Sequence, residues 1–167
     1  EGGAQDLFRR VDGSEEWLQW EITPWYTQPN EIGGIILHSE VVTARVAAQA
    51  AQRESEDRYR LLYETMAQGA VFQDAESRIT HANPAAQRIL GRSLPELQGR
   101  TSIDARWKAV HEDGSDFPGD THPAVIAVQT GHPVRATIMG VFNPKDNAYR
   151  WINIAAVPRF RPGETRP

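Results

Sequence analysis

The segment Ile79-Thr-His-Ala-Asn-Pro-Ala-Ala86 joins a strand to a helix and decides the fold of the second half of the chain. Asn83 followed by Pro84 is typical of a helix start, because an asparagine side chain accepts hydrogen bonds from free backbone N–H groups and proline fits the first helical position. Gly91 can adopt the left-handed conformation that ends a helix. The sequence therefore predicts a strand that ends at residue 82 and a helix over residues 85–90.

Further elements follow on both sides of this segment. A strand over residues 70–74 and a turn at Glu76-Ser77 precede the strand over residues 78–82. After the helix, the pattern predicts a helical turn at 94–98, a segment without clear period at 101–117, a helix at 123–130 capped by Asp120 or Thr121, and strands at 134–142 and 149–160. This order predicts the α+β class, with an antiparallel sheet covered on one face by short helices.

An internal repeat relates the two ends of the chain. Trp17 aligns with Trp151, Pro24 with Pro158 and Asp12 with Asp146, all at an offset of 134 residues (151 − 17, 158 − 24 and 146 − 12). In each copy a turn precedes about ten residues rich in Trp, Ile and Val, which indicates a hairpin followed by a strand. The first copy continues into a further strand at 32–41, and its equivalent would begin near residue 166.

A helix is predicted between the copies, over residues 43–66, where Ala, Gln, Glu, Arg and Leu are frequent and neither proline nor glycine occurs. Steps of four and three residues form a thin coiled-coil seam, whose members are Ala48, Gln52, Ser55, Tyr59, Leu62 and Met66. Two interpretations stay open for this helix, a coiled-coil dimerisation element and a solvated connector.

The composition describes an ordinary globular chain and excludes several functions. Its 167 residues have a net charge of −4, which argues against a nucleic-acid partner. Without cysteine, the chain has no disulfide, thiolate metal site or cysteine nucleophile. The longest apolar run, Ile32–Leu37, is far shorter than the roughly 20 residues of a membrane span, so no membrane insertion is expected. Nucleotide-binding glycine loops, the serine-hydrolase elbow and the zinc-protease motif are also absent, so we expect a non-catalytic fragment of a longer protein.

Four stretches of the chain resemble the PAS family of sensor domains with its C-terminal PAC motif. They are Ser55-Glu-Asp-Arg-Tyr-Arg-Leu-Leu62, Ile79 to Ala86, Leu90-Gly-Arg-Ser-Leu-Pro-Glu-Leu-Gln-Gly99, and Trp107 with His111-Glu-Asp-Gly-Ser-Asp-Phe-Pro118. The resemblance implies a five-stranded antiparallel sheet in the order 2-1-5-4-3. It also implies that residues 1–42 are the C-terminal strands of a preceding PAS domain, 43–66 a signalling linker, and 67–167 a PAS domain that lacks its last strand.

In that order the absent strand would be central in the sheet. We therefore expect the slot to be filled by a following segment of the parent protein, or by residues 32–41 of a second chain through strand exchange. The partner predictions are a homodimer, formed through the linker helix or by strand exchange, and an unknown small-molecule ligand.

A polar cluster and a few large side chains are the candidate site residues. The cluster His111, Glu112, Asp113, Asp116, Asp120 and His122 lacks the fixed spacing of metal ligands, so Asp113-Gly-Ser is interpreted as a turn and Asp120 as a helix cap. The resemblance places a ligand pocket between the aperiodic segment, a helix and the sheet. Its predicted contacts are Trp107, His111, Phe117, His122, Ile126, Met139 and Phe142.

The expected function is that of a sensory module that binds a ligand or partner and relays a conformational change through the linker helix to an output domain. The parent protein would be a bacterial sensor histidine kinase or diguanylate cyclase, with this fragment in the cytoplasm. Two alternatives stay open: a ligandless dimerisation spacer, and a haem gas sensor that uses His122, although a first-turn histidine more often anchors a loop. The resemblance also implies that flavin photoadduct chemistry is excluded, because that chemistry needs a cysteine.

Overall fold

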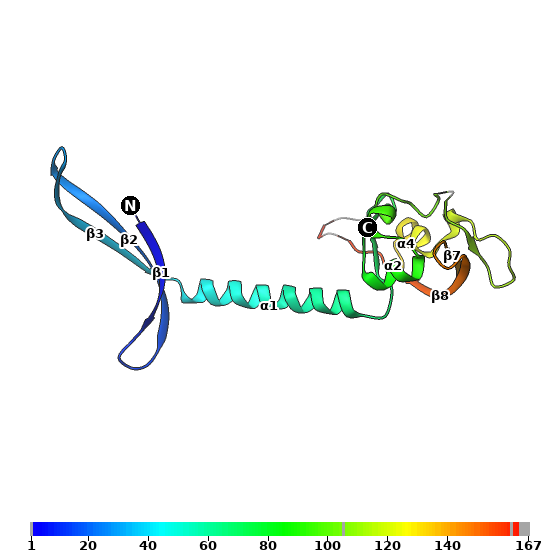
Figure 1. Cartoon of the computed structure of the whole chain (residues 1–167), viewed down its shortest axis with the longest axis horizontal. Coiled ribbons are helices and arrows are strands. Elements are labelled where there is room, and N and C mark those ends of the chain that lie inside the picture. Colours follow the sequence, from blue (N-terminus) through cyan, green and yellow to red (C-terminus); the bar gives the residue numbers. More distant parts are fainter. Residues whose placement is uncertain (1, 105, 161, 164–167) are drawn as a thin grey trace. The chain divides into compact units, whose positions relative to one another are not determined.

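A computed structural model describes residues 2–104, 106–160 and 162–163 of the chain. The chain divides into two units, residues 1–60 and 61–167, each of which has its own internal contacts. Each unit is described by itself below, and Figure 1 labels the larger elements.

The first unit contains a three-stranded antiparallel sheet with the order β1-β2-β3. Its strands are β1 (Gly2–Arg9), β2 (Glu15–Gln28) and β3 (Glu31–Val41). The turn before β2 is formed by Asp12, whose Oδ1 accepts hydrogen bonds from the Ser14 N–H and hydroxyl at 2.9 and 2.6 Å. Many apolar side chains of this sheet are exposed, as Ile35 at 63% and Leu37 at 62% show.

Helix α1 (Thr43–Thr65) follows the sheet and has no buried residue. Val42, which joins β3 to the helix, is only 3% exposed. The Thr43 hydroxyl accepts a hydrogen bond from the Trp17 N–H at 2.8 Å, so the helix start is tied to β2. No helix in the described part of the chain is long and apolar enough to cross a membrane.

The second unit contains two antiparallel sheets, β4-β5 and β6-β7-β8. The strands are β4 (Val71–Gln73), β5 (Ile79–Ala82), β6 (Ala109–Val110), β7 (Val134–Asn143) and β8 (Ala148–Ala156). The short helices are α2 (Pro84–Leu90), α3 (Leu94–Leu97), η1 (Gly119–Thr121) and α4 (Pro123–Thr130). The described residues do not join the two sheets into one, so the order 2-1-5-4-3 stays a prediction. Strand β6 lies in the segment for which the sequence showed no period.

Two buried asparagines hold the ends of α2. Asn83, which is 0% exposed, accepts a hydrogen bond from the Ala86 N–H at 2.8 Å, which confirms the predicted helix cap. At the other end the Asn143 amide donates to the Arg88 and Ile89 carbonyls at 3.2 and 3.1 Å. Gly91, with φ of +64°, is the C-terminal cap of α2, as predicted.

The cap of α4 differs from the prediction. His122 occupies the cap position of this helix, whereas Asp120 and Thr121 belong to the preceding η1 turn. The prediction that Asp120 or Thr121 caps the helix is therefore wrong. The physical reason is that the Thr121 hydroxyl donates to the Pro118 carbonyl at 2.7 Å, inside η1, instead of accepting from the helix.

The core of the second unit consists of two hydrophobic clusters. The first cluster consists of Ile79 and Ala82 from β5, Ala86 from α2 and Leu97 from α3. Ala109, Met139 and Val141 form the second, on the β6-β7-β8 sheet. Leu90 and Trp107 pack against both clusters, so these two side chains connect the parts of the domain that the two sheets build.

The repeat appears in the structure as two similar hairpins, β1-β2 and β7-β8. Their registers differ by one residue, because Trp17 lies opposite Leu7 whereas Trp151 lies opposite Gly140, the equivalent of Asp6. The first connection has one residue more, since Arg9 pairs with Glu15 and Asn143 with Ala148. Strand β2 also pairs with β3, whereas among the described residues β8 pairs only with β7.

Candidate functional site

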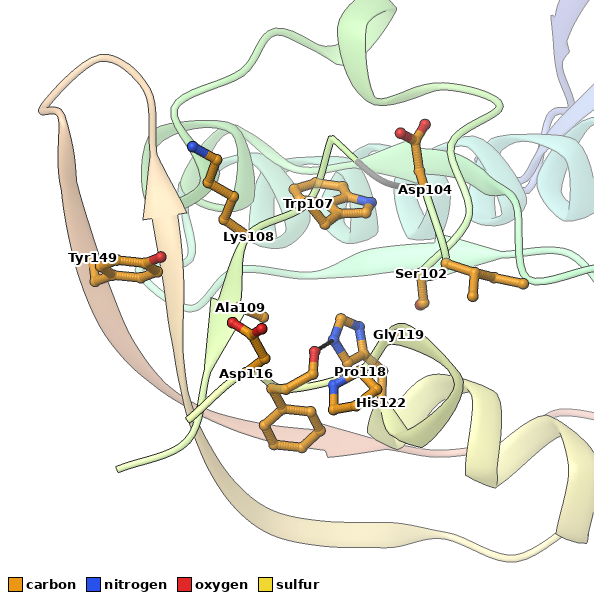
Figure 2. Close-up of a pocket in the computed structure, with 12 residues that line it drawn as sticks. Ser102, Asp104, Trp107, Lys108, Ala109, Asp116, Pro118, Gly119, His122 and Tyr149 are labelled. Carbon is orange, nitrogen blue, oxygen red and sulfur yellow. Dashed lines mark hydrogen bonds between the residues drawn. The ribbon is translucent and has the colours of Figure 1, made fainter. Parts of the chain in front are cut away.

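A cleft of about 410 Å³ lies beside Trp107 in the second unit (Figure 2). Its walls come from residues 102–104, 107–109 and 116–119, together with His122 and Tyr149. The volume falls in the range of small-molecule sites. The wall contains aromatic rings and also three charged side chains, those of Lys108, Asp104 and Asp116.

Trp107 is held in a fixed orientation at this cleft. Its indole N–H donates to the Thr101 carbonyl at 2.9 Å. The ring packs against both hydrophobic clusters. The guanidinium groups of Arg92 and Arg100 lie 5.6 and 5.8 Å from the ring centroid, within the range of cation–π contacts. A molecule that displaces this ring therefore acts on both clusters at once.

Phe117 lies between two histidines. The His111 ring stacks on it with centroids 4.0 Å apart, and the His122 ring meets it edge-on at 5.3 Å. His122 Nε2 lies 3.3 Å from the Phe117 carbonyl oxygen, the contact drawn in Figure 2. Because that oxygen can only accept, Nε2 carries the proton and Nδ1 is the acceptor of a neutral imidazole.

Gly119 permits a close backbone approach at the mouth of the cleft. A Cβ atom on this residue would lie 2.2 Å from the Ser102 carbonyl oxygen and 2.8 Å from the Ile103 Cα. These are backbone atoms that cannot rotate away. The absence of a side chain at Gly119 therefore brings η1 and the 102–103 segment together.

Asp104 forms a local ion pair with Arg106. The Arg106 side chain and backbone N–H both bind its carboxylate, and these hydrogen bonds are the main causes that hold the pKa of Asp104 far below its usual range. Sequence reasoning did not single out this pair. The Asp-x-Arg spacing is its only signal in the sequence.

The structure separates the predicted ligand contacts into three groups. Trp107, Phe117 and His122 line the cleft, whereas His111 is not among the described residues of its wall and stacks on Phe117. Met139 is 2% exposed and belongs to the cluster against which Trp107 and Phe117 pack. Ile126 and Phe142 are half-buried and are not among the described residues of the cleft wall. Phe142 instead contacts two residues of that wall, Tyr149 and Lys108.

The polar cluster around Asp113 forms a turn. Asp113 Oδ1 accepts hydrogen bonds from the Ser115 N–H and hydroxyl at 2.9 and 2.6 Å, the same arrangement as in the turn before β2. These bonds are the main causes that lower the pKa of Asp113. Within the described ranges no three side chains of the metal-ligating types gather into a possible metal site.

His122 makes a testable contribution to pH-dependent stability. Burial lowers the pKa of this imidazole, opposed by the Phe117 carbonyl and by the Asp120 charge. The folded chain therefore binds this proton less readily than the unfolded chain does. Neutral His122 therefore stabilises the folded chain at pH values above the unfolded pKa of roughly 6.5. This contribution to the free energy of unfolding is lost as the pH falls from there toward the folded pKa.

We expect His122→Gln, which keeps an N–H donor but takes up no proton, to flatten the loss of stability between pH 7 and pH 5. Urea unfolding at a series of pH values measures this slope. His132→Gln, at an exposed position after α4, is the matched control and should leave the slope as it is. An unchanged slope in His122→Gln would assign the acid sensitivity to other groups.

The fold and site define a small α+β domain in which antiparallel strands and short helices surround a cleft. The sequence pattern of the PAS fold matches residues 57–166. Because this match covers more than half of the chain, the chain belongs to the PAS family. PAS domains have a sensory role and are generally non-catalytic.

Among solved structures, the chain is similar to the crystal structure of the E. coli DhaR(N)-DhaL complex, with a TM-score of 0.45 and 16% sequence identity. The alignment covers 86% of this chain and 51% of that chain. The chain thus spans about half the length of the structure that it matches.

Proposed function

We propose that this chain is a sensory input module that binds a small ligand in the cleft bordered by Trp107, Phe117 and His122. The observation that carries the proposal is the double role of Trp107, which lines the cleft and packs on both hydrophobic clusters. A ligand at this ring can favour one packing arrangement over another, as a sensor requires.

The proposed relay runs from the first cluster to helix α1. Ala82 and Ala86 of that cluster flank Asn83, whose amide donates to the carbonyls of Tyr63 and Gln68 at 3.2 and 2.9 Å. Tyr63 lies in the last turn of α1. Packing changes beneath α2 therefore have a hydrogen-bonded connection to the end of the helix.

Thermal-shift measurements on the 167-residue chain with small acids, flavin and haem test the proposal. We expect one class to raise the melting temperature. Trp107→Phe should weaken that ligand's affinity about tenfold or more, because it reduces the ring area and removes the hydrogen bond to Thr101 that orients the ring. Trp151→Phe, at a position 54% exposed on β8, is the control and should keep the affinity. A ligand that binds the Trp107→Phe variant unchanged would remove the cleft from the proposal.

The alternative proposal is a ligandless dimerisation spacer, and the surface of α1 favours it. Leu61 and Leu62 are 61% and 60% exposed on a helix without buried residues. Lack of stabilisation by any compound, together with sedimentation as a dimer that Leu62→Glu dissociates, would support the spacer. A dimer unaffected by Leu62→Glu would direct attention to strand exchange, in which β3 of a second chain pairs with β8.

The haem alternative has weaker support, because His122 Nε2 already binds the Phe117 carbonyl. A Soret band that appears on haem addition, and that is absent in the His122→Gln variant, would support this alternative. The parent protein that we propose is a histidine kinase or diguanylate cyclase, with this module in the cytoplasm.

A further inference from the structure

Two arginines that contact Trp107, a residue of the cleft wall, have buried N–H groups without partners in the described structure. Arg100 is only 9% exposed, and its Nη1 is a buried atom with no hydrogen-bond partner in the described structure. The Nε of half-buried Arg92 is likewise buried and unpaired there. Such groups lose their hydration without replacement, which is costly for any donor and more so for a charged one.

Both guanidinium groups lie against the same indole ring, that of Trp107. The contact with the ring offsets part of the cost of burial, but it places two like charges close together. Burial, followed by repulsion from Arg92 and Arg106, lowers the pKa of Arg100. Asp104 and Glu96 oppose this lowering, so the positive charge around Trp107 is offset in part.

The neighbouring carboxylates have other partners. Glu96 accepts hydrogen bonds from the Ser93 N–H and hydroxyl at 2.8 and 2.6 Å, and Asp104 is bound by Arg106. The Arg100 Nε donates to the Glu96 backbone carbonyl, not to its carboxylate. In the described part of the chain neither Arg92 nor Arg100 forms an ion pair.

We propose that the ligand of the cleft is a small organic anion, whose carboxylate or phosphate oxygens bind Arg92 and Arg100 and whose apolar body lies along Trp107. Guanidinium groups suit this role because their planar N–H donors match the oxygens of both anions. Trp107 connects the two features, since it contacts both arginines and also forms a wall of the cleft. This inference rests on the proposed function and adds the chemical class of the ligand.

Benzoate, phenyl phosphate and benzamide are the probes, at constant ionic strength. Benzoate and benzamide have nearly the same shape and differ in charge, whereas phenyl phosphate tests the second kind of anion. Binding is followed through the indole N–H resonance of Trp107, which Trp107→Phe assigns. We expect one or both anions to shift this resonance saturably and benzamide to leave it unchanged. The anion that binds tells carboxylate from phosphate.

Arg92→Gln and Arg100→Gln are expected to weaken anion binding about ten- to a hundredfold, the usual effect of losing a charged hydrogen bond. Arg88→Gln, an exposed arginine of α2, makes the same charge change and should keep the affinity. Without anion, Arg92→Gln should melt at the same temperature as the original chain or higher, because it removes a repulsion. A merely structural arginine would instead lower the melting temperature. If Arg100→Gln does not fold, Arg92→Gln decides.

Three results would overturn the anion inference: equal binding of benzoate and benzamide, anion affinity unchanged in Arg92→Gln, or no shift with either anion. The first two leave a ligand cleft in place, so the proposed function survives them. In the third case, the broader thermal-shift screen decides whether the cleft binds any ligand.

Discussion

Replacing Asn83 with alanine is expected to lower the free energy of unfolding of the second unit by about 4 kcal/mol. The side chain is 0% exposed and every polar position on it is used. Its Oδ1 accepts from the N–H groups of Ala70 and Ala86 at 2.9 and 2.8 Å, and its amide donates to the Tyr63 and Gln68 carbonyls. Alanine would remove all four of these hydrogen bonds, and the N–H of buried Ala86 would lose its acceptor.

Urea unfolding followed by circular dichroism measures this change. Asn153→Ala, at an exposed position on β8, is the matched control and should cost little. Hydrogen exchange supplies a local readout, because the Ala70 and Ala86 N–H groups should exchange much faster once their acceptor is gone. A cost for Asn83→Ala no larger than for the control would show that water replaces these bonds, and would weaken the proposed relay to α1.

Local signals made the helices of the second unit predictable from the sequence. Asn83-Pro84 and Gly91 mark the ends of α2, and Gly131 ends α4 with φ of +69°. Each signal depends on the conformation of one or two residues and on bonds within one turn. The strands β7 and β8 were also predictable, because the turn and the apolar run that follows it occur twice in the chain.

Contacts between distant segments were not predictable in the same way. Asn143 reaches the end of α2 across 55 residues, and a buried asparagine after a strand resembles any turn residue in the sequence. His122 takes the cap position of α4 because η1 occupies residues 119–121 directly before it, and no local pattern indicated that turn.

The candidate site shows the same division. Trp107 and His122 were identified because the family resemblance places a pocket near them, and both line the cleft. Arg92 and Arg100 were missed, since arginines in polar segments are usually solvated. Only the folded arrangement, which brings both to one indole ring, reveals their unpaired N–H groups. A sequence therefore locates this cleft better than it describes the charge around it.

Gly91→Ala is expected to cost about 3 kcal/mol, from two separable effects. The first is the backbone conformation, with φ of +64°, which disfavours any side chain. The second is a clash, because the added Cβ would lie 2.0 Å from Asn143 Oδ1. Asn143 is 1% exposed and cannot move away, since it holds the α2 carbonyls and accepts from the Lys145 and Asp146 N–H groups.

Gly99→Ala separates the two effects. Gly99 has φ of +75°, but nothing lies within 4 Å of the position of an added Cβ. This variant should therefore cost only the conformational part, about 1 kcal/mol. The difference between the two unfolding free energies, measured in urea under identical conditions, is the energy of the clash with Asn143. Equal costs for the two variants would mean that Asn143 yields easily, and that the contact between α2 and the end of β7 is looser than its hydrogen bonds imply.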